Sequence, residues 1–381
     1  MPAAPVRCAI LPPVPVPYRE PLFARLAERG RLAARVIYQS GRQPGWDQRP
    51  DWFPERHPYD SVVLPSWQRS RPGRSPIVLP RGLGPALDEL DPRCVVSWEY
   101  GPATLRSLAW CGRRGRPLVV FSELTPVSER ELPPLQLRLH RALARRARGF
   151  LAASSSARER LLRMGVPPER IEVSLQSADV GRLRAAAGPH ARRPDGPVRV
   201  LAVGRLVPDK NVALLIEAFA EAGLYEGEAE LELCGSGPLE RELREAARRL
   251  RVPASFRGYV EPAELPARYA QADLLALVST YEPFGVAVRE AVAAGLPVLC
   301  TRAAGAVGDF AREGENALLV DPFDRSQVAA ALHRLVREPA LRERMAAASR
   351  ALADATPPDA DAEAFERAVL RAVGEAEPVP R

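Results

Sequence analysis

Residues 198–222 read VRVLAVGRLVPDKNVALLIEAFAEA, in which a short apolar run leads through a polar loop into a second apolar pattern. The run predicts a buried strand over Val198–Val203, and the spacing of the later apolar residues predicts a helix over 212–222. A strand that passes directly into a helix is the repeating unit of folds in which helices cover a parallel sheet. This stretch therefore predicts an α/β fold.

The same alternation continues on both sides of this stretch, with short apolar runs that predict strands and amphipathic patterns that predict helices. The proline-rich and aromatic segment 46–80 is interpreted mostly as loop. The further predicted strands are 6–11, 34–38, 94–98, 118–121, 150–153, 171–175, 230–234, 254–259, 274–278, 297–300 and 317–320. The further predicted helices include 21–29, 157–164, 239–250, 285–294, 326–337 and 359–373.

The stretch 188–197, GPHARRPDGP, is rich in proline, glycine and polar residues, and it is interpreted as a linker between two domains. Two runs of strand–helix alternation joined by a linker predict two Rossmann-like doubly wound domains facing a central cleft. The expected boundaries are 1–187 for the first domain, 198–355 for the second, and 356–381 for a final helix and tail.

Composition excludes several classes of protein. Hydrophobic residues make up 46% and charged residues 27%, which is ordinary for a globular chain and excludes disorder as the overall class. There is no apolar run long enough to span a membrane and no secretory signal pattern, so a cytoplasmic protein is expected. The five cysteines and four histidines are scattered without metal-ligand spacing, so no metal site is expected.

The charged residues point to an anionic ligand. Lys210 is the only lysine among 54 basic residues, which marks a position that needs a compact ammonium group, unless it survives by chance. Residues 1–190 contain 30 arginines and 17 acidic residues, a net charge of +13, whereas residues 191–381 carry −6. This asymmetry favours an anionic partner for the first half, and a solvated arginine-rich surface is the alternative.

The loop after the strand Val198–Val203 carries the first candidate site. Gly204 ends the strand, Arg205 and Lys210 lie five residues apart, and a helix follows at once. Free N–H groups and a partial positive charge at a helix start attract anions, so the loop predicts a diphosphate-binding site. An ordinary loop in which Asp209 pairs with Arg205 is the alternative.

The segment EPFGVAVRE, residues 282–290, is the second candidate site and follows the predicted strand 274–278. Glu282 precedes a predicted helix, Glu290 lies two turns along it, and Gly285 allows a ligand to approach the backbone closely. Carboxylates accept hydrogen bonds from paired sugar hydroxyls, as in ribose recognition. The alternative is a charged helix start, which the helix dipole favours on its own.

Residues 198–345 resemble the C-terminal domain of retaining glycosyltransferases of the GT-B fold, specifically family 4. The resemblance rests on five motifs in the family's order: GRLVPDKN, LCGSGPLE, FRGYV, ADLLALVSTYEPFGVAVREAVAAGLPVL and GENALLV. It implies that the final helix crosses back to the first domain, which is the acceptor side, and that Asn316 is structural.

The same resemblance implies roles for individual residues. Arg205 and Lys210 would bind the donor diphosphate and stabilise charge on it, Glu290 would hold the ribose, and Glu282 would hold the transferred sugar. The remaining donor-binding residues that it implies are Gly204, Gly258, Tyr259, Val260, Phe284, Gly285 and Val286.

The first half resembles the family more loosely, over residues 150–183. The family's glycine-rich loop after the first strand is replaced by proline-rich sequence, so Tyr18 or Arg19 is expected to take the place of its contacts, on the acceptor side. Glu123 stands where many members have a histidine, and a carboxylate there would orient the acceptor or steady positive charge. Glu99, at another strand end, is a weaker candidate. The alternative for Glu123 is an ion pair with one of the many arginines.

Residues 135–148, LQLRLHRALARRAR, form a basic amphipathic pattern. Such a helix would lie on an anionic membrane surface, on the inner face of the cell membrane, and the alternative is a partly buried helix of the domain. No nucleic-acid motif accompanies the pI of about 9.5, so no nucleic-acid partner is expected.

The resemblance implies a retaining hexosyltransferase without cofactors. It would use a nucleotide-diphosphate sugar, UDP- or GDP-linked, as donor substrate and a hydroxyl acceptor in a cell-envelope glycolipid, a polysaccharide or a natural product. The alternatives are a non-catalytic sugar-nucleotide-binding protein and another GT-B enzyme such as a sugar-nucleotide epimerase.

Overall fold

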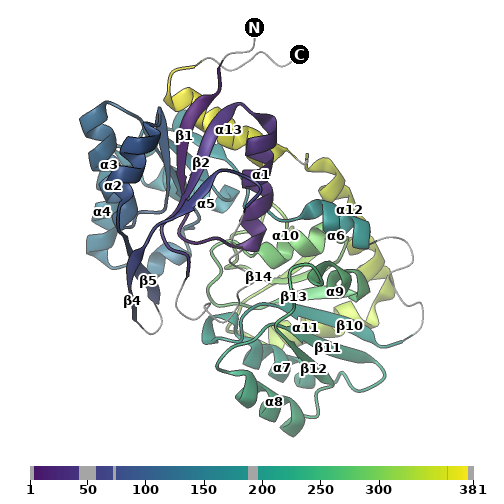
Figure 1. The fold of residues 1–381 in the computed structure, drawn as a ribbon. Helices are drawn as coiled ribbons and strands as arrows, with labels where there is room; N and C mark the ends of the chain where they lie inside the picture. Colours follow the sequence, from purple (N-terminus) through teal and green to yellow (C-terminus); the bar gives the residue numbers. More distant parts are fainter. Residues whose placement is uncertain (1–3, 43–56, 72–73, 188–195, 358, 376–381) are drawn as a thin grey trace. The chain divides into compact units, whose positions relative to one another are not determined.

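The structure is a computed structural model that describes residues 4–42, 57–71, 74–187, 196–357 and 359–375 (Figure 1). The chain divides into two compact units. Unit 1 comprises residues 1–177 together with 359–381, and unit 2 comprises residues 178–358.

Unit 1 contains a seven-stranded parallel sheet with the strand order β3-β2-β1-β6-β7-β8-β9. Crossover helices cover both faces of this sheet, as the alternation predicts (Figure 1). The strands are β1 Val6–Leu11, β2 Leu32–Tyr38, β3 Ser61–Val63, β6 Cys94–Trp98, β7 Leu118–Ser122, β8 Gly149–Ala152 and β9 Ile171–Val173. The helices are α1 Glu20–Arg29, α2 Leu83–Leu90, α3 Pro102–Arg114, α4 Pro134–Ala144, α5 Ser155–Arg163 and α13 Ala360–Ala372.

Strand β1 shows how the sheet builds two cores. Val6, Cys8 and Ile10 pack on one face, with α1 and α13. Ala9 and Leu11 point to the other face and pack with α2, α3 and α5. This alternation follows from the two-residue period of a strand, and both sets are fully buried.

Helix α13 returns the end of the chain to unit 1. Its Phe365 is fully buried in the core of that unit, and its Glu366 is fully buried and pairs with Arg29 of α1 at 3.1 Å. Ser174 also donates a 2.9 Å hydrogen bond to the backbone carbonyl of Asp361. The final helix therefore crosses back to the first unit, as expected.

Unit 2 contains a six-stranded parallel sheet with the order β12-β11-β10-β13-β14-β15. Strand β10 lies between β11 and β13, so the loop after β10 leaves from the middle of the sheet. The strands are β10 Val198–Val203, β11 Ala229–Cys234, β12 Ala254–Gly258, β13 Leu274–Leu277, β14 Val298–Thr301 and β15 Ala317–Val320. The helices are α6 Val180–Ala186, α7 Val212–Glu221, α8 Glu240–Arg249, α9 Leu265–Gln271, α10 Val286–Ala293, α11 Arg325–Arg337 and α12 Pro339–Ala355.

Two predictions about the elements need correction, and one helix was not predicted. The segment 46–80 is not mostly loop in its described part, because it contains β3 and an antiparallel hairpin of β4, Ser66–Arg71, and β5, Arg74–Pro80. The helix expected over 135–148 ends at Ala144, where α4 gives way to the turn before β8. The 17-residue helix α12 was not anticipated.

The boundary between the units also differs from the expected one. It falls at residue 177 rather than 187, because α6 contacts α9 and α10 of unit 2. Most of the expected linker, residues 188–195, lies outside the described residues. Within the described part of the chain, no helix is long and apolar enough to cross a membrane.

Candidate functional site

The loop between β10 and α7 is fixed at both ends. It begins at Gly204, which has a φ of 155°, and it ends at Asn211, which has a φ of 55° and precedes α7. The Asn211 side-chain amide donates to the carbonyls of Val278 at 3.2 Å and Pro322 at 2.7 Å. Asparagine tolerates this left-handed backbone, and its amide ties the loop to the segment after β13.

Three strand ends meet closely beside this loop. The N–H of Gly204 donates to Cys234 at 3.0 Å, and the N–H of Gly235 donates to Gly258 at 2.7 Å. A Cβ atom on Gly235 would overlap the carbonyl oxygen of Gly204, and one on Gly237 would overlap the carbonyl of Leu206. Only glycine permits this approach, which brings the predicted donor residues Gly204 and Gly258 together at the carboxyl ends of β10 and β12.

Lys210 meets Glu282 in the middle of this edge. The Lys210 ammonium donates to Glu282 Oε2, and the Ser279 hydroxyl donates to the same oxygen at 3.2 Å. Both charged side chains are mostly buried, with 23% and 10% of their surface exposed. The backbone N–H of Thr280 donates to the carbonyl of Asp209 at 2.9 Å and holds the two segments in register.

Arg205, by contrast, is exposed next to this pair. A small cavity of about 20 Å³ opens beside Arg205 and Lys210 and is also lined by Gly204 and Ser279. Two basic side chains and a glycine backbone thus border one space at the start of a helix, which suits a phosphate group.

Gly285 caps the start of helix α10 and has a φ of 98°. A Cβ on Gly285 would lie 3.3 Å from Glu282 Cγ, so a larger residue would press on the glutamate as well as strain the backbone. The N–H of Gly305 donates to the carbonyl of Glu282 at 3.0 Å, and that of Ala306 donates to Phe284 at 2.7 Å. These bonds fix the segment that carries Glu282, Phe284 and the first residue of α10, Val286.

Glu290 has a different environment from Glu282, although both lie on the same segment. The Tyr269 hydroxyl, from α9, donates to Glu290 Oε2 at 2.6 Å. Burial raises the pKa of Glu290, while this hydrogen bond opposes the rise by stabilising the carboxylate. Tyr269 is fully buried, so it holds one carboxylate oxygen in place. The sequence gives no signal for this contact, because Tyr269 reads as a core residue.

Three further residues of unit 2 were named from the sequence: Tyr259, Val260 and Asn316. Tyr259 and Val260 are half-buried and follow the end of β12 directly. Asn316 is 1% exposed, and its amide bonds to Phe310 at 2.8 Å and Ser349 at 3.1 Å. It is structural, as expected.

The acceptor-side residues of unit 1 also come together, at the carboxyl ends of β6 and β7 and at the start of α1. Arg19 donates to Glu123 Oε1 at 2.6 Å, and the Trp98 indole N–H donates to the same oxygen at 3.0 Å. The Arg19 guanidinium lies 5.2 Å from the Trp98 ring centre and 5.3 Å from that of Tyr18. The alternative for Glu123, an ion pair with an arginine, is therefore what the structure shows, and the arginine is another predicted residue.

Glu99 supports Glu123 through the backbone. Its carboxylate accepts from the N–H groups of Glu123 and Leu124, the latter at 3.2 Å, and from the Ser122 hydroxyl at 3.3 Å. Burial and the nearby charge of Glu123 raise the pKa of Glu99 to about 7. Glu99 has a φ of 53°, an uncommon conformation for a glutamate. These contacts make Glu99 a residue that positions the segment after β7.

Trp98 is the residue of this group that the sequence did not single out. It ends β6, its ring stacks on Phe121 at 4.0 Å, and it is 3% exposed. A tryptophan in a buried strand reads as core, and only the indole hydrogen bond to Glu123 reveals its second role.

Two family models match the chain. Residues 189–352 match the family described as "Glycosyl transferases group 1", and residues 22–175 match "Glycosyltransferase Family 4". The two matches share no residues and together span most of both units.

Curated relatives match shorter stretches. The chain is similar to "Alpha-D-kanosaminyltransferase" of Streptomyces kanamyceticus, with 29% identity over 232 residues, 58% of this chain and 60% of the relative. It is also similar to "Glycogen synthase" of Mycobacterium tuberculosis, with 32% identity over 212 residues, 55% of this chain and 50% of the relative. The matched part is thus about half the length of these relatives.

Solved structures match the fold over nearly the whole chain. The crystal structure of Anabaena Alr3699/HepE in complex with UDP and glucose superposes with a TM-score of 0.74 at 20% identity. It covers 96% of this chain and 100% of its own. At this identity the likeness shows a shared fold.

Proposed function

Because the chain belongs to glycosyltransferase family 4 and has the GT-B fold, we propose that it is a retaining glycosyltransferase. It moves a hexose-type sugar from a nucleoside-diphosphate donor to a hydroxyl acceptor. The observation that carries this proposal is the Lys210–Glu282 pair, which joins the two family motifs at the carboxyl edge of the unit 2 sheet. In open α/β sheets, ligands bind at this edge.

The donor would bind to the same edge. Arg205 and Lys210 would hold the diphosphate at the start of α7, and the ammonium group of Lys210 would exchange Glu282 for a phosphate oxygen. Glu282 would then be free to accept hydrogen bonds from the sugar. Glu290, held by Tyr269, would accept from the ribose hydroxyls.

The nucleobase would lie against Gly258, Tyr259 and Val260, at the end of β12. Uridine is the base that we propose, and the support is the complex of UDP and glucose with the similar Anabaena protein. GDP is the competing donor nucleotide. No cofactor or metal is part of the proposal.

The reaction needs no side-chain nucleophile. The bond between the anomeric carbon and the departing phosphate oxygen breaks, and a bond from that carbon to the acceptor oxygen forms on the same face. The departing phosphate takes the proton of the acceptor hydroxyl. Arg205 and Lys210 stabilise the negative charge that develops on the diphosphate, which is where preorganised charges lower a barrier most.

The acceptor-side cluster of Tyr18, Arg19, Glu99 and Glu123 would bind and orient the acceptor. Arg19 and Trp98 both bond to Oε1 of Glu123, and the other oxygen, Oε2, has no partner among the described residues. The Glu123 side chain is 21% exposed. Oε2 would therefore accept a hydrogen bond from an acceptor hydroxyl, while Arg19 and Trp98 hold the carboxylate in place.

Helix α4 supports a peripheral location on an anionic membrane surface. Leu135 is 77% exposed and Leu139 is 38% exposed, although both are apolar. Arg138 and Arg141 are exposed beside them and form no ion pair with any described residue. Exposed leucines between arginines suit a helix that lies in a lipid–water interface, which would give access to a lipid-linked acceptor.

The first test is a thermal-unfolding panel with UDP, GDP, dTDP and ADP. A ligand at 100 times its dissociation constant stabilises a protein by about 2.7 kcal/mol, which is a readable shift. We expect one nucleotide, UDP, to stabilise the wild type and not Lys210→Ala. Incubation with the matching nucleotide sugar and an acceptor, followed by NMR of the product, then tests retention. Absence of a response to every nucleotide would contradict the donor assignment.

Vesicle flotation tests the membrane surface. We expect binding to vesicles that contain phosphatidylglycerol and not to those of phosphatidylcholine alone, with loss of binding in Leu135→Ser. Phe323→Ser is a matched control, since Phe323 is 78% exposed but belongs to unit 2. Equal binding to both vesicle types would contradict the role of α4.

A further inference from the structure

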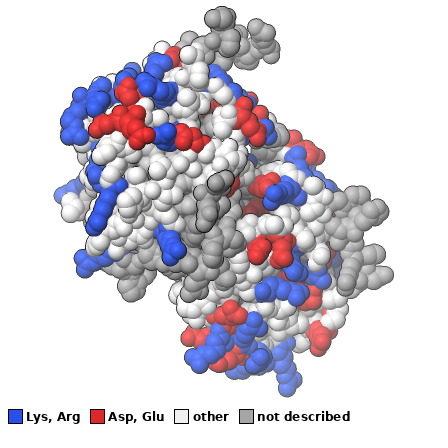
Figure 2. Space-filling view, viewed as in Figure 1, with Lys and Arg blue, Asp and Glu red and all other residues white. Residues whose placement is uncertain are grey.

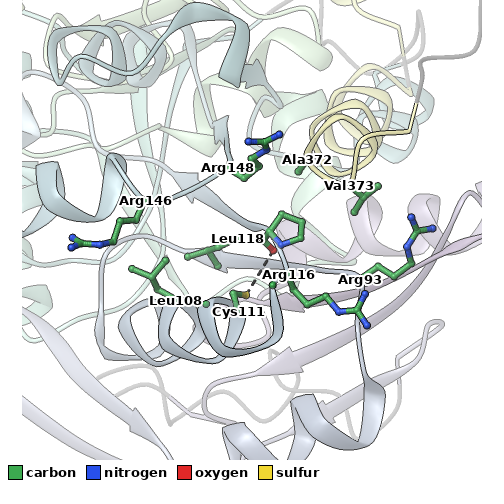
Figure 3. A pocket seen from close by; sticks show the side chains of 12 residues that line it. Arg93, Leu108, Cys111, Arg116, Leu118, Arg146, Arg148, Ala372 and Val373 are labelled. Atoms are coloured by element: carbon green, nitrogen blue, oxygen red, sulfur yellow. Dashed lines mark hydrogen bonds between the residues drawn. The ribbon is translucent and has the colours of Figure 1, made fainter.

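A pocket of about 480 Å³ opens in unit 1, away from the residues described so far (Figure 3). It lies where β6, β7 and β8 begin and where α3, α4 and α13 end. Four arginines contribute to its wall, and apolar side chains from α3, β7 and α13 contribute the rest. The arginines are Arg93, Arg116, Arg146 and Arg148.

The four arginines fall into two classes. Arg93 pairs with Glu375 at 2.5 Å, and Arg116 pairs with Asp91 at 3.3 Å. Arg146 and Arg148 are exposed and form no ion pair with any residue that the structure describes. Arg146 makes only a 3.5 Å contact with the carbonyl of Ala142, at the end of α4. The pocket therefore presents two guanidinium groups whose charge is balanced by no carboxylate of the described residues.

Apolar residues form the other part of the wall. Leu118 begins β7, Leu108 lies on α3, and Val373 follows α13. Cys111 also lines the pocket, but its thiol is buried and donates to the carbonyl of Pro117 at 3.7 Å. In the view of Figure 3, Arg93 and Arg116 lie to the right of the apolar residues of α3 and β7, Arg146 lies to their left, and Arg148 lies above them. A ligand in the pocket would contact both positively charged guanidinium groups and apolar side chains.

The pocket is separate from the acceptor-side cluster. Glu123 follows the carboxyl end of β7, whereas Leu118 is the first residue of that strand. A strand of this length rises about 3.3 Å per residue, so some 15 Å separate its two ends. A small ligand in the pocket does not reach Glu123.

We propose that this pocket is a second binding site in unit 1, for a phosphate ester with a small apolar part. The planar guanidinium fork matches phosphate oxygens in a bidentate manner, and Arg146 and Arg148 are the pocket arginines that no carboxylate of the described residues engages. The apolar part contacts Leu118 and Val373. Free phosphorylated metabolites and phospholipid headgroups share this chemistry.

Occupancy of the site has a structural consequence. Ala372 and Val373 line the pocket at the end of α13, the helix that returns the chain to unit 1. Arg93 already pairs with Glu375 just beyond this helix. A bound phosphate ester adds contacts between the end of α13 and the sheet, so it stabilises the docking of this helix.

The test is calorimetric titration of the full chain with inorganic pyrophosphate, in a Lys210→Ala background that removes the proposed donor contact. We expect saturable binding that Arg146→Ala/Arg148→Ala weakens at least tenfold. The matched control is Arg113→Ala/Arg145→Ala. Both control arginines are exposed and do not line the pocket; Arg113 lies in the last turn of α3, and Arg145 directly follows α4. Figure 2 shows that basic side chains are plentiful on this part of unit 1, near α3, so the control tests for general attraction. It should change affinity less than twofold.

Vesicles separate the two sources of phosphate. Flotation of the same variants with phosphatidic acid in phosphatidylcholine vesicles tests the headgroup, and the pyrophosphate titration tests the free ligand. Saturable binding of either probe with loss only in Arg146→Ala/Arg148→Ala supports the site. Equal loss in both double variants, or no binding of either probe, overturns it. Arg146 and Arg148 belong to unit 1 and the proposed donor residues to unit 2, so a loss of binding confined to Arg146→Ala/Arg148→Ala does not depend on the proposed donor site.

Discussion

Two pairs of opposite charge lie at corresponding edges of the two units, and they are built differently. In unit 2, Lys210 bonds to Glu282 through a single ammonium group, and 23% of the lysine side chain is exposed. In unit 1, Arg19 bonds to Glu123 while its guanidinium also lies against two aromatic rings, and 7% of its side chain is exposed. A flexible lysine can leave its partner for an incoming phosphate, whereas a stacked arginine stays in place.

This difference assigns the pairs to different tasks. Under the proposed function, the Lys210 pair would be a contact that the donor diphosphate displaces, whereas the Arg19 pair would stay in place and hold one carboxylate oxygen of Glu123. Breaking each pair should therefore affect different measurements, activity in the first case and stability in the second.

The largest effect is expected for Lys210→Ala. Loss of one preorganised charge at the departing group lowers turnover by about 10²–10³-fold. Some stability should be lost as well, because Glu282 is left without its cation although only 10% of its side chain is exposed, but the bond from Ser279 remains. Initial rates of sugar transfer and thermal unfolding measure the two quantities. Lys210→Arg tests whether a planar guanidinium group can replace the ammonium group of Lys210, and we expect its turnover to stay below that of wild type. Activity near wild type in Lys210→Ala would remove the donor role of this lysine.

Arg19→Met should produce the reverse pattern in unit 1. It leaves the mostly buried Glu123 without its cation, and breaking such a pair destabilises a protein by about 3 kcal/mol. Denaturant unfolding measures the change, and the double variant Arg19→Met/Glu123→Gln should recover part of it. Nucleotide binding should be unaffected, because the pair lies in unit 1. A stability equal to that of wild type would show that the pair is not a rigid fixture.

The sequence predicted the strand bounds and the site residues of unit 2 better than it predicted the structure of unit 1. The bounds of β1, β6, β10 and β15 agree with the apolar runs, because buried strands need continuous apolar sequence. The hairpin of β4 and β5 was missed, because its residues alternate weakly and include proline. Lys210 and Glu282 could be singled out because both lie in motifs by which the unit 2 sequence resembles a known family.

The partners within each site were harder to predict. Glu282 lies 72 residues from Lys210, and Glu123 lies 104 residues from Arg19, so only the fold brings them together. Trp98 and Tyr269 read as core residues because they are core residues, with one polar atom each that serves a carboxylate. Local patterns contain no information on such pairs.

Glu99, which supports the Glu123 segment of unit 1, makes the stability of the protein depend on pH. Its pKa is about 7 in the folded chain against an ordinary value of 4.5, so the folded state keeps a proton that the unfolded state has lost between these values. Its contribution to stability is therefore present below pH 4.5 and is lost as pH rises to 7, by at most about 1.4 kcal/mol per pH unit.

His140 works in the opposite sense over a similar range. Burial, aided by Arg160, lowers the pKa of His140 to about 4, so stability falls as pH drops below 6.5. The difference in unfolding free energy between Glu99→Gln and wild type isolates the glutamate. We expect this difference to shift in favour of the variant between pH 4.5 and 7. A constant difference would mean that Glu99 is ionised throughout.

The smallest effect is expected for Tyr269→Phe, which removes the hydrogen bond to Glu290. The variant loses about 1 kcal/mol of stability and binds the donor nucleotide several-fold more weakly, because the carboxylate is no longer held. The pKa of Glu290 rises further in the variant, since that hydrogen bond stabilises the ionised carboxylate. As pH is lowered, nucleotide affinity should therefore start to decline at a higher pH than in wild type. Tyr38→Phe is the matched control, because this buried tyrosine bonds to Tyr59 in unit 1 at 2.7 Å. A loss of nucleotide affinity in both variants would mean that Tyr269 acts through general stability, and a loss in Tyr269→Phe alone would show that unit 2 also fixes one of its carboxylates rigidly.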